Sequence, residues 1–407
     1  MPFSALGLSS LVVAAANKKL YIQPTPIQSA AIPLILRGDD VLAQAATGSG
    51  KTAAFALPLL QLVQTAQRKV LILVPTRELA VQVGEEIKGL VKHLPVAIKV
   101  VSVFGGVSIN PQMMALRGHA DVLVATPGRL LDLIKQNAIK PESFNTLVLD
   151  EADRLLDMGF SDEINRILAL LPAQRQNLFF SATFPVDVSA LAEGILQNPS
   201  KIVMEVNEAN TPNILQRAIA VDESRRAELL AQMIIDSGEE RALVFVASKV
   251  ITEQLARYLS SAGIKAAPFH GEFSQGRRSQ VLAEFKSSNL QVVVATDLAG
   301  RGIDIDNLPC VINFDLPRSP ADYTHRIGRT ARAGGSGVAI SLVSASSEAH
   351  FRLLENRLKM RVPREQIAGF EPQEVVTTTE QGTGGIKGHR MSKKDKLRAA
   401  AAQKQDE

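Results

Sequence analysis

The chain has 407 residues, which is more than one hydrophobic core usually supports, so we expect two domains. Its 46% hydrophobic and 21% charged residues are typical of a soluble globular protein, and no apolar run is long enough to span a bilayer. The single cysteine excludes an intrachain disulfide framework, and the net charge of +4 is compatible with a polyanionic partner.

Three further features concern the compartment and metals. The first lysine is Lys18, so the N-terminus lacks the basic region of a signal peptide; with a single cysteine, we expect a cytoplasmic protein and no membrane partner. Cys310 precedes Val311 and Ile312 in an apolar run, and we predict that it is a small core residue. The six histidines show no metal-ligand spacing, so no zinc site is expected.

The first strand-like run, residues 41–43, leads into a glycine-rich segment whose members are Ala45, Ala46, Thr47, Gly48, Ser49, Gly50, Lys51 and Thr52. Glycines let the backbone wrap around a phosphate chain, so that N–H groups and a helix N-terminus face the negative charge. Lys51 can then reach the β- and γ-phosphates, and the Thr52 hydroxyl can hold Mg²⁺. The general pattern has Gly where Ala45 stands, so this segment alone is also compatible with an ordinary glycine-rich turn.

Strand-like runs alternate with helical patterns in both halves of the chain. The runs are 41–43, 70–74, 100–104, 121–125, 146–149 and 177–180 in the first half, and 243–246, 292–295, 311–314 and 338–342 in the second. This alternation predicts an α/β fold, in which parallel sheets are covered by helices on both faces.

Composition also suggests the domain boundaries. We expect an N-terminal domain over residues 1–207 and a C-terminal domain over 214–365, joined by a linker at 208–213 within the polar segment 205–213. Residues 366–407 are expected to form a basic tail that is disordered or a frayed helix. This tail either makes non-specific phosphate contacts or only adds solubility.

Two carboxylates, Asp150 and Glu151, follow the apolar run 146–149. Parallel sheets bind ligands at the carboxyl ends of their strands, so Asp150 is placed to hold Mg²⁺, mainly through water. Glu151 can orient and deprotonate an attacking water. A solvated acidic turn is the alternative for these residues alone, but the phosphate-loop pattern upstream favours nucleoside triphosphate hydrolysis.

An arginine series lies in the second half. Arg326, Arg329 and Arg332 are three residues apart, which predicts one face of a helix over 325–332. Arginine can clamp phosphate oxygens bidentately, and one supplied across a domain cleft would neutralise charge developing on a γ-phosphate. A solvated basic surface is the alternative.

Together these segments resemble the DEAD-box ATP-dependent RNA helicases from about Phe3 to about Pro363, and most closely the bacterial RhlE-type branch. Residues 150–153 read Asp-Glu-Ala-Asp, and the other family motifs follow in the expected order: 24–28, 75–80, 105–106, 126–129, 181–183, 295–297, 301–304 and 325–332. The resemblance implies two tandem RecA-like domains, each a parallel sheet with helices on both faces. It also implies an RNA-stimulated ATPase that closes two domains on RNA.

The resemblance assigns residues to roles. ATP and Mg²⁺ would be bound by Tyr21, Gln28, Thr47, Gly48, Ser49, Gly50, Lys51, Thr52, Asp150 and Asp304. Lys51, Asp150, Glu151, Arg329 and Arg332 would carry catalysis, with Asp153, Ser181 and Thr183 coupling hydrolysis to unwinding. The RNA backbone would run along Thr76, Arg77, Gly106, Thr126, Arg129 and Thr296. These hydroxyls, N–H groups and arginines suit recognition of phosphate and 2′-OH, which does not depend on base sequence.

Two departures from the family pattern stand out. Leu20 occupies the position before Tyr21 where the family usually has Gly, which weakens the case for stacking on adenine. Ala331 replaces the Gly common between the last two arginines; since Ala suits a helix better, we expect catalysis to survive.

Three functions compete on this sequence. An ATP-dependent RNA helicase that unwinds short duplexes or remodels RNA–protein complexes is favoured, with roles in ribosome assembly or mRNA turnover and partners in ribosome assembly intermediates or the RNA-degradation machinery. A DNA translocase of the same superfamily and a non-hydrolysing, ATP-gated RNA clamp are the alternatives. Lys51, Asp150, Glu151, Arg329 and Arg332 are all present, which argues against a dead site.

Overall fold

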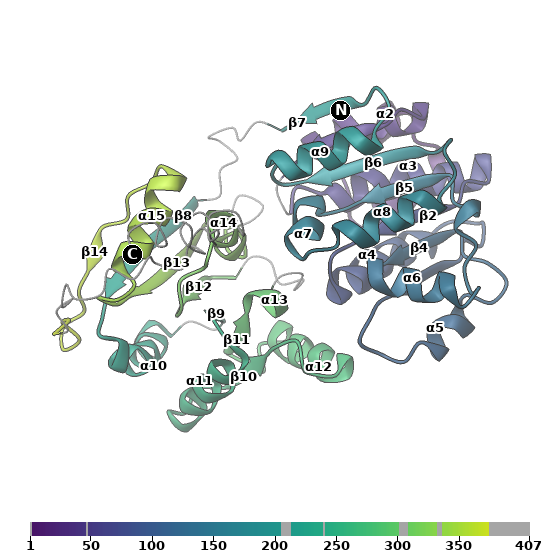
Figure 1. Cartoon of the computed structure of the whole chain (residues 1–407). Helices are drawn as coiled ribbons and strands as arrows, with labels where there is room; N and C mark the ends of the chain where they lie inside the picture. Colours follow the sequence, from purple (N-terminus) through teal and green to yellow (C-terminus); the bar gives the residue numbers. More distant parts are fainter. Residues whose placement is uncertain are drawn as a thin grey trace, which may run out of the picture.

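The computed structural model describes residues 2–45, 48–204, 213–238, 241–300, 308–331 and 336–373. Two seven-stranded sheets organise these residues, and every strand pair in them is parallel. Each sheet carries its own helices (Figure 1). The predicted α/β class with two parallel sheets is therefore confirmed.

The first sheet has the strand order β3-β4-β2-β5-β6-β1-β7. Its strands are β1 Val41–Gln44, β2 Val70–Leu73, β3 Val100–Val103, β4 Val122–Ala125, β5 Thr146–Leu149, β6 Gln176–Ser181 and β7 Ser200–Val203. The helices between them are α1 Ser10–Lys18, α2 Pro26–Arg37, α3 Lys51–Ala66, α4 Arg77–Val91, α5 Asn110–Ala115, α6 Pro127–Lys135, α7 Ala152–Asp157, α8 Ser161–Leu170 and α9 Val186–Ile195, with short 3-10 turns at Phe3–Leu6 and Pro141–Ser143.

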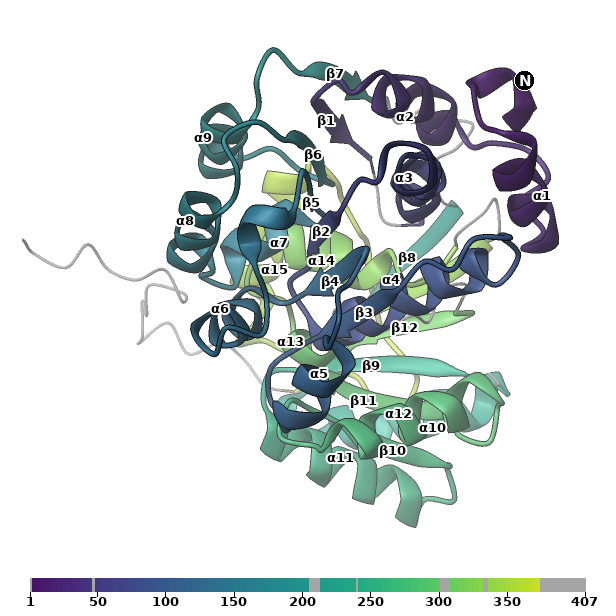
Figure 2. The same ribbon diagram turned by 90° about the vertical axis from the view of Figure 1, so that its right-hand side faces the viewer.

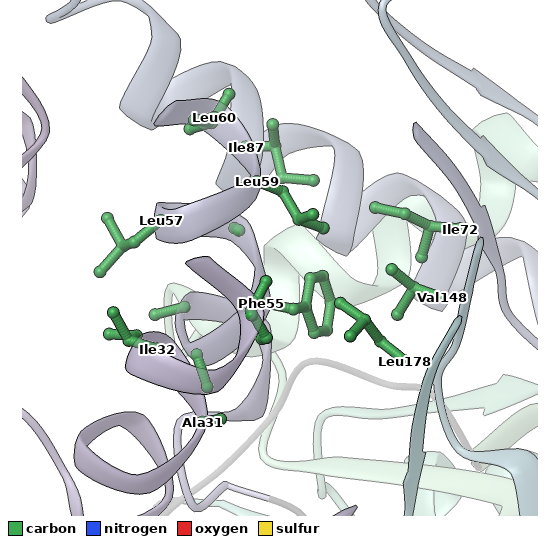
Figure 3. Close-up of a cluster of buried hydrophobic side chains, with 14 of the residues drawn as sticks. Ala31, Ile32, Phe55, Leu57, Leu59, Leu60, Ile72, Ile87, Val148 and Leu178 are labelled. Atoms are coloured by element: carbon green, nitrogen blue, oxygen red, sulfur yellow. The ribbon is translucent and has the colours of Figure 1, made fainter. Parts of the chain in front are cut away.

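Alternating side chains of these strands enter two different cores. On β2, Val70 and Ile72 pack with α1–α4, while Leu71 and Leu73 pack with α6–α9 on the opposite face. Figure 2 shows the two groups of helices on the two sides of the sheet. Phe55 of α3 lies at the centre of the first core beside Val148 and Leu178 (Figure 3). Because both faces are covered, the strands are almost wholly apolar, and this made them easy to predict.

The second sheet has the order β10-β11-β9-β12-β13-β8-β14. Its strands are β8 Asn213–Ala220, β9 Ala242–Val246, β10 Ala266–Phe269, β11 Val292–Thr296, β12 Cys310–Asn313, β13 Ser336–Val343 and β14 Arg364–Glu365. Its helices are α10 Arg226–Ser237, α11 Lys249–Ser261, α12 Gln275–Lys286, α13 Asp297–Gly300, α14 Pro320–Ile327 and α15 Glu348–Leu358, after a 3-10 turn at Glu223–Arg225. Cys310 is buried in this sheet and forms no disulfide, as predicted.

Each predicted strand overlaps an observed one, but β7, β8, β10 and β14 had not been predicted. Three of these, β7, β10 and β14, are edge strands, and β10 contains Pro268. An edge strand buries less surface and tolerates Pro, so its sequence carries a weaker signal.

The expected linker and tail lie mostly outside the described residues. Asn213, placed in the linker, begins β8. The described start of the expected tail packs on the second sheet: Ile367 and Phe370 contact its core, and the Arg225 guanidinium lies 4.4 Å above the Phe370 ring. The Gln373 N–H donates to both carboxylate oxygens of Asp222 at 3.0 Å. The exact domain boundaries stay predictions.

The predicted helix over 325–332 is wrong in its extent, since α14 ends at Ile327. Arg326 lies in its last turn and is 2% exposed. Ala331 has φ 54°, a left-handed conformation that a helix does not contain. The argument that Ala331 suits a helix therefore fails, and Gly would fit this conformation better.

Candidate functional site

The predicted site residues of the first half gather along one edge of the first sheet. Parallel strands bring their carboxyl ends to the same edge. The phosphate-loop segment follows β1, Asp150 and Glu151 follow β5, and Ser181 ends β6, and these three strands are neighbours. The candidate RNA residues Thr76, Gly106 and Thr126 follow β2, β3 and β4, so the two sets lie side by side along the edge.

The described part of the phosphate-loop segment combines left-handed glycines, a helix N-terminus and a lysine. Gly48 and Gly50 have φ 79° and 91°, and Gly50 is the N-cap of α3. Lys51 is buried, and its Nζ donates to the Ala45 carbonyl at 3.0 Å. The positive end of α3 and a lysine therefore converge where an anion would bind. Thr47 lies outside the described residues.

Gln28 connects the start of α2 to this segment. Its Oε1 accepts from the Thr25 N–H at 2.9 Å, and its Nε2 donates to the Gly50 carbonyl at 3.1 Å. A Cβ on Gly50 would lie 2.5 Å from that Nε2, so a larger residue at position 50 would clash with Gln28. Tyr21 is half-buried and packs against the first core. The preceding Leu20 has φ 61°, a conformation that explains the preference for Gly at this position.

The two carboxylates after β5 have opposite electrostatic environments. Burial raises the pKa of Asp150 to about 6; Lys51 opposes this rise, while Glu151 and Asp153 add to it. Burial also acts to raise the pKa of Glu151, but Arg154, Lys51 and Arg329 outweigh it and lower the value to about 2. Arg154 Nη1 donates to Glu151 Oε2 at 2.9 Å. Glu151 is therefore held ionised and oriented, as an acceptor for the hydrogens of a water molecule must be.

The residues expected to couple hydrolysis to unwinding are hydrogen-bonded to one another. Both the N–H and the hydroxyl of Thr183 donate to Asp153 Oδ2, at 2.9 and 2.8 Å. The Ser181 hydroxyl accepts from the Asp153 N–H at 3.2 Å and donates to the Thr183 carbonyl at 2.7 Å. Asp153 lies two residues after Glu151, so these hydrogen bonds connect the segment after β5 to the end of β6.

The arginines of the second sheet separate into different environments. Arg326 makes a two-pronged ion pair with Asp297 at 2.6 and 2.7 Å, and its Nη1 donates to Asn313 Oδ1 at 3.0 Å. These partners all belong to the second part, by which we mean the second sheet and its helices; the first part is the first sheet and its helices. Arg326 is therefore engaged within the second part. Arg329 is 7% exposed, and its charge lowers the pKa of Glu151 in the first part. Arg332 and Asp304 lie outside the described residues.

The candidate RNA residues also have defined positions. Thr76 caps α4 by accepting from the Leu79 N–H at 3.3 Å, and the Thr126 hydroxyl accepts from the Gly105 N–H at 3.3 Å. Gly106 has φ 75°, and a Cβ there would overlap the Arg77 guanidinium. Thr296 ends β11 on the second sheet and is partly exposed.

Arg129 has one satisfied and one unsatisfied end. Its Nη2 donates to the Val107 carbonyl at 2.8 Å, whereas its Nη1 is buried and makes no hydrogen bond within the described part of the chain. A buried guanidinium nitrogen without an acceptor is costly, so it favours a site that an anionic oxygen completes.

Sequence reasoning missed an ion pair between the two parts. Arg278 of α12 and Glu78 of α4 are only 5% and 7% exposed, and Arg278 Nε lies 2.7 Å from Glu78 Oε1. Arg278 Nη1 also donates to the His270 carbonyl at 3.0 Å, and the guanidinium lies 4.5 Å from the centre of the Phe269 ring. Glu78 falls within the segment 75–80 that carries the resemblance, but no local signal identifies a partner 200 residues away.

The described residues lack a membrane-spanning helix and a metal-binding cluster. They contain no helix that is both long and apolar enough to cross a membrane. They also contain no group of three or more His, Cys, Asp or Glu side chains arranged to hold a metal ion.

Comparisons with known proteins agree with this arrangement. Residues 25–191 match the model of the DEAD/DEAH box helicase family, and residues 225–334 match the helicase conserved C-terminal domain. The DEAD-box ATP-dependent RNA helicase CshA of Bacillus cereus is 40% identical over 364 residues, which cover 89% of this chain and 69% of that protein. CshA of Geobacillus kaustophilus is also 40% identical, over 89% of this chain and 78% of its own length.

Superposition on solved structures compares the relative placement of the two parts. A DEAD box protein from Methanococcus jannaschii is 38% identical, covers 90% of this chain and 99% of its own, and superposes with a TM-score of 0.53. Dbp5 of S. cerevisiae bound to RNA and ADP BeF3 is only 30% identical and covers 90% of this chain and 95% of its own chain. It nevertheless superposes with a higher TM-score, 0.79. The two sheets here are thus arranged more nearly as in the RNA-bound relative. The RhlE-type branch stays a prediction. By its motifs, fold and relatives, the chain belongs to the family of DEAD-box ATP-dependent RNA helicases.

Proposed function

We propose that ATP hydrolysis takes place where the carboxyl edge of the first sheet meets Arg329 of the second part, and that RNA completes this site by holding the two parts together. The chain is an RNA-stimulated ATPase and helicase by family.

The first step is binding of the triphosphate. The N–H groups of the segment 48–52 and the start of α3 would receive the phosphates, with Lys51 exchanging the Ala45 carbonyl for the β- and γ-phosphates. Gln28 would hydrogen-bond to the adenine edge, and Tyr21 would stack on the base. The hydrogen bond from Gln28 to the Gly50 carbonyl connects this base-binding residue to the phosphate loop. Two further residues are predicted to bind ATP: Thr47 at the phosphates and Asp304 at the ribose.

The carboxylates fit a bound Mg²⁺. Asp150 is a buried carboxylate whose pKa burial raises to about 6 and whose neighbours Glu151 and Asp153 add negative charge, so a cation would stabilise it. Mg²⁺ commonly takes one or two carboxylates together with substrate phosphates and water, which suits Asp150, mainly through water, and the Thr52 hydroxyl. When bound, the ion would neutralise charge on the β- and γ-phosphates.

Chemistry would then depend on residues from both parts. Glu151, held ionised and oriented by Arg154, would align the attacking water and accept its proton. Arg329 would neutralise charge developing on the γ-phosphate, with Arg332 as a second arginine. Asp153, Ser181 and Thr183 would pass the loss of phosphate to the RNA edge.

RNA would lie along Thr76, Arg77, Gly106, Thr126, Arg129 and Thr296. Five of these follow β2, β3 and β4, next to the nucleotide edge, and Thr296 ends β11. They offer hydroxyls, backbone N–H groups and guanidinium groups, which bind phosphate and 2′-OH. Binding should therefore be independent of base sequence.

One observation carries the proposal: Arg329 of the second part is 7% exposed, and its charge lowers the pKa of Glu151 in the first part. Arg329→Ala should reduce turnover by on the order of a thousandfold or more while ATP affinity changes little. Arg329→Lys should recover little of this, because an ammonium group cannot make the planar two-pronged contact. Near-normal turnover of Arg329→Ala would contradict the proposal.

A fragment provides a second measurement. Residues 1–207, expressed alone, should bind ATP weakly and show almost no RNA-stimulated hydrolysis. If this fragment hydrolyses ATP as fast as the whole chain, the second part does not belong to the active site.

The biological setting is also a proposal. We infer a cytoplasmic role in ribosome assembly or mRNA turnover, because the implied RNA contacts carry no sequence preference and suit varied RNA–protein complexes. Crosslinking in cells would test it: recovery of neither ribosomal RNA nor mRNA would refute this assignment.

A further inference from the structure

The segment that carries Arg329 is held by a small buried cluster in the second part. After α14 ends at Ile327, the chain turns at Gly328 and runs past Leu308 as a single parallel bridge between Leu308 and Thr330. The Leu308 N–H donates to the Arg329 carbonyl at 3.2 Å, and the Thr330 hydroxyl donates to the Leu308 carbonyl. Thr330 and Leu308 are 0% and 1% exposed.

Gly337 of β13 closes the opposite side of this segment. A Cβ built there would overlap the Thr330 hydroxyl oxygen and lie 2.9 Å from both the Thr330 Cβ and the Ala331 nitrogen. Gly337 is not among the glycines with positive φ, so its backbone conformation does not demand glycine. The requirement comes from space: only a residue without a side chain lets β13 run against Thr330.

β13 is in turn fixed in the sheet. The Val338 N–H donates to the Pro309 carbonyl at 3.0 Å, next to Leu308, and β13 pairs with β12 on one side and β8 on the other. The Arg329–Thr330 backbone is therefore confined between Leu308, two residues before β12, and the first residues of β13. This matters because, in the proposed mechanism, the side chain of Arg329 must reach a γ-phosphate bound at the edge of the first sheet.

We propose that Thr330 and Gly337 are positioning residues for Arg329, and that the contact of Thr330 with Leu308 and Gly337 sets how far Arg329 extends toward the other part. We name these three residues, Leu308, Thr330 and Gly337, the clasp. The proposal rests on the role proposed above for Arg329 and adds residues outside those assigned above to nucleotide or RNA.

The first test is Gly337→Ala. The added methyl displaces Thr330, and a displacement on the order of 1 Å costs roughly a hundredfold in turnover. kcat for RNA-stimulated ATP hydrolysis should fall by about that factor, while KM for ATP changes by less than about threefold, because the expected ATP-binding residues of the first part are untouched. Gly194→Ala is the matched control: Gly194 lies in α9 of the first part, and its added Cβ meets nothing within 4 Å, so kcat should be unchanged.

A second pair of variants tests the clasp without adding atoms to a crowded site. Thr330→Val keeps the shape but loses the donor to the Leu308 carbonyl, and kcat should fall by about tenfold. Thr330→Ser keeps the donor and should retain nearly the wild-type kcat. A role confined to fold stability would lower the melting temperature and leave kcat, measured well below it, unchanged for all three clasp variants. That result would overturn the proposal.

A double-mutant cycle separates the clasp from Arg329 itself. If the clasp acts through Arg329, Gly337→Ala should cost little further in an Arg329→Ala background. Full additivity of the two losses would overturn the clasp and leave the role of Arg329 standing. A normal kcat of Arg329→Ala would instead refute the proposed function.

Discussion

The ion pair between Glu78 and Arg278 gives a direct test of whether closure of the two parts controls activity. Both side chains are nearly buried, at 7% and 5% exposure, and the pair spans the two sheets through α4 and α12. We consider Arg278→Gln, Glu78→Gln and the double variant, because glutamine is polar, removes the charge at either position and has the same shape as glutamate. Each single change leaves one buried charge without its partner.

The magnitude follows from that burial. Breaking a buried ion pair by removing one partner costs about 3–5 kcal/mol. Because the two residues belong to different parts, opening the molecule returns the remaining charge to water, so the cost falls on the closed state alone. The ratio of closed to open molecules should therefore fall by roughly two to three and a half orders of magnitude, since about 1.4 kcal/mol corresponds to tenfold.

The assay is the RNA concentration that half-saturates ATP hydrolysis, together with energy transfer between dyes on the two parts. The single variants should need far more RNA and show less closure, whereas the double variant should lose no more than either single variant. Arg257→Gln is the matched control, because Arg257 pairs with Glu253 at the surface at 3.7 Å and such pairs contribute little. RNA half-saturation within about threefold of wild type for Arg278→Gln would refute the reasoning.

Four further predictions follow from the site and the backbone. Glu151→Gln should keep ATP and RNA binding but lose roughly two to four orders of magnitude in turnover, measured by phosphate release; near-normal turnover would remove Glu151 from its role. Gln28→Ala should weaken ATP binding and reduce discrimination against GTP in competition with a fluorescent ADP analogue, and equal use of ATP and GTP by the wild type would contradict the adenine assignment. RNA affinity should fall steeply with salt and hardly vary among unstructured RNAs of equal length, so a strong preference for one sequence would point to another recognition surface. Leu20→Gly should raise the free energy of unfolding by roughly 0.5–1 kcal/mol, because Leu20 is 81% exposed and has φ 61°; a lower melting temperature would contradict this.

The sequence by itself determined the α/β class, the central strands and the residues that gather at the edge where we expect the nucleotide. Runs such as Thr146–Leu149 are apolar because both faces of the sheet are covered, so their signal is local and strong. The glycines and Lys51 of the phosphate loop, and the carboxylates after β5, were predictable for the same reason: their chemistry depends on residues adjacent in the chain. The rule that parallel strands bind ligands at their carboxyl ends then placed them together.

Only the tertiary structure decided which charged residues meet. The spacing of Arg326 and Arg329 predicted equivalent positions on one helix, yet α14 ends between them; Arg326 is bound by Asp297, and Arg329 acts on Glu151 of the other part. No local pattern encodes such pairs, because they depend on how two sheets pack. The left-handed backbone of Ala331 likewise results from the packing of its segment between β12 and β13, and the intrinsic helix preference of alanine does not outweigh that constraint.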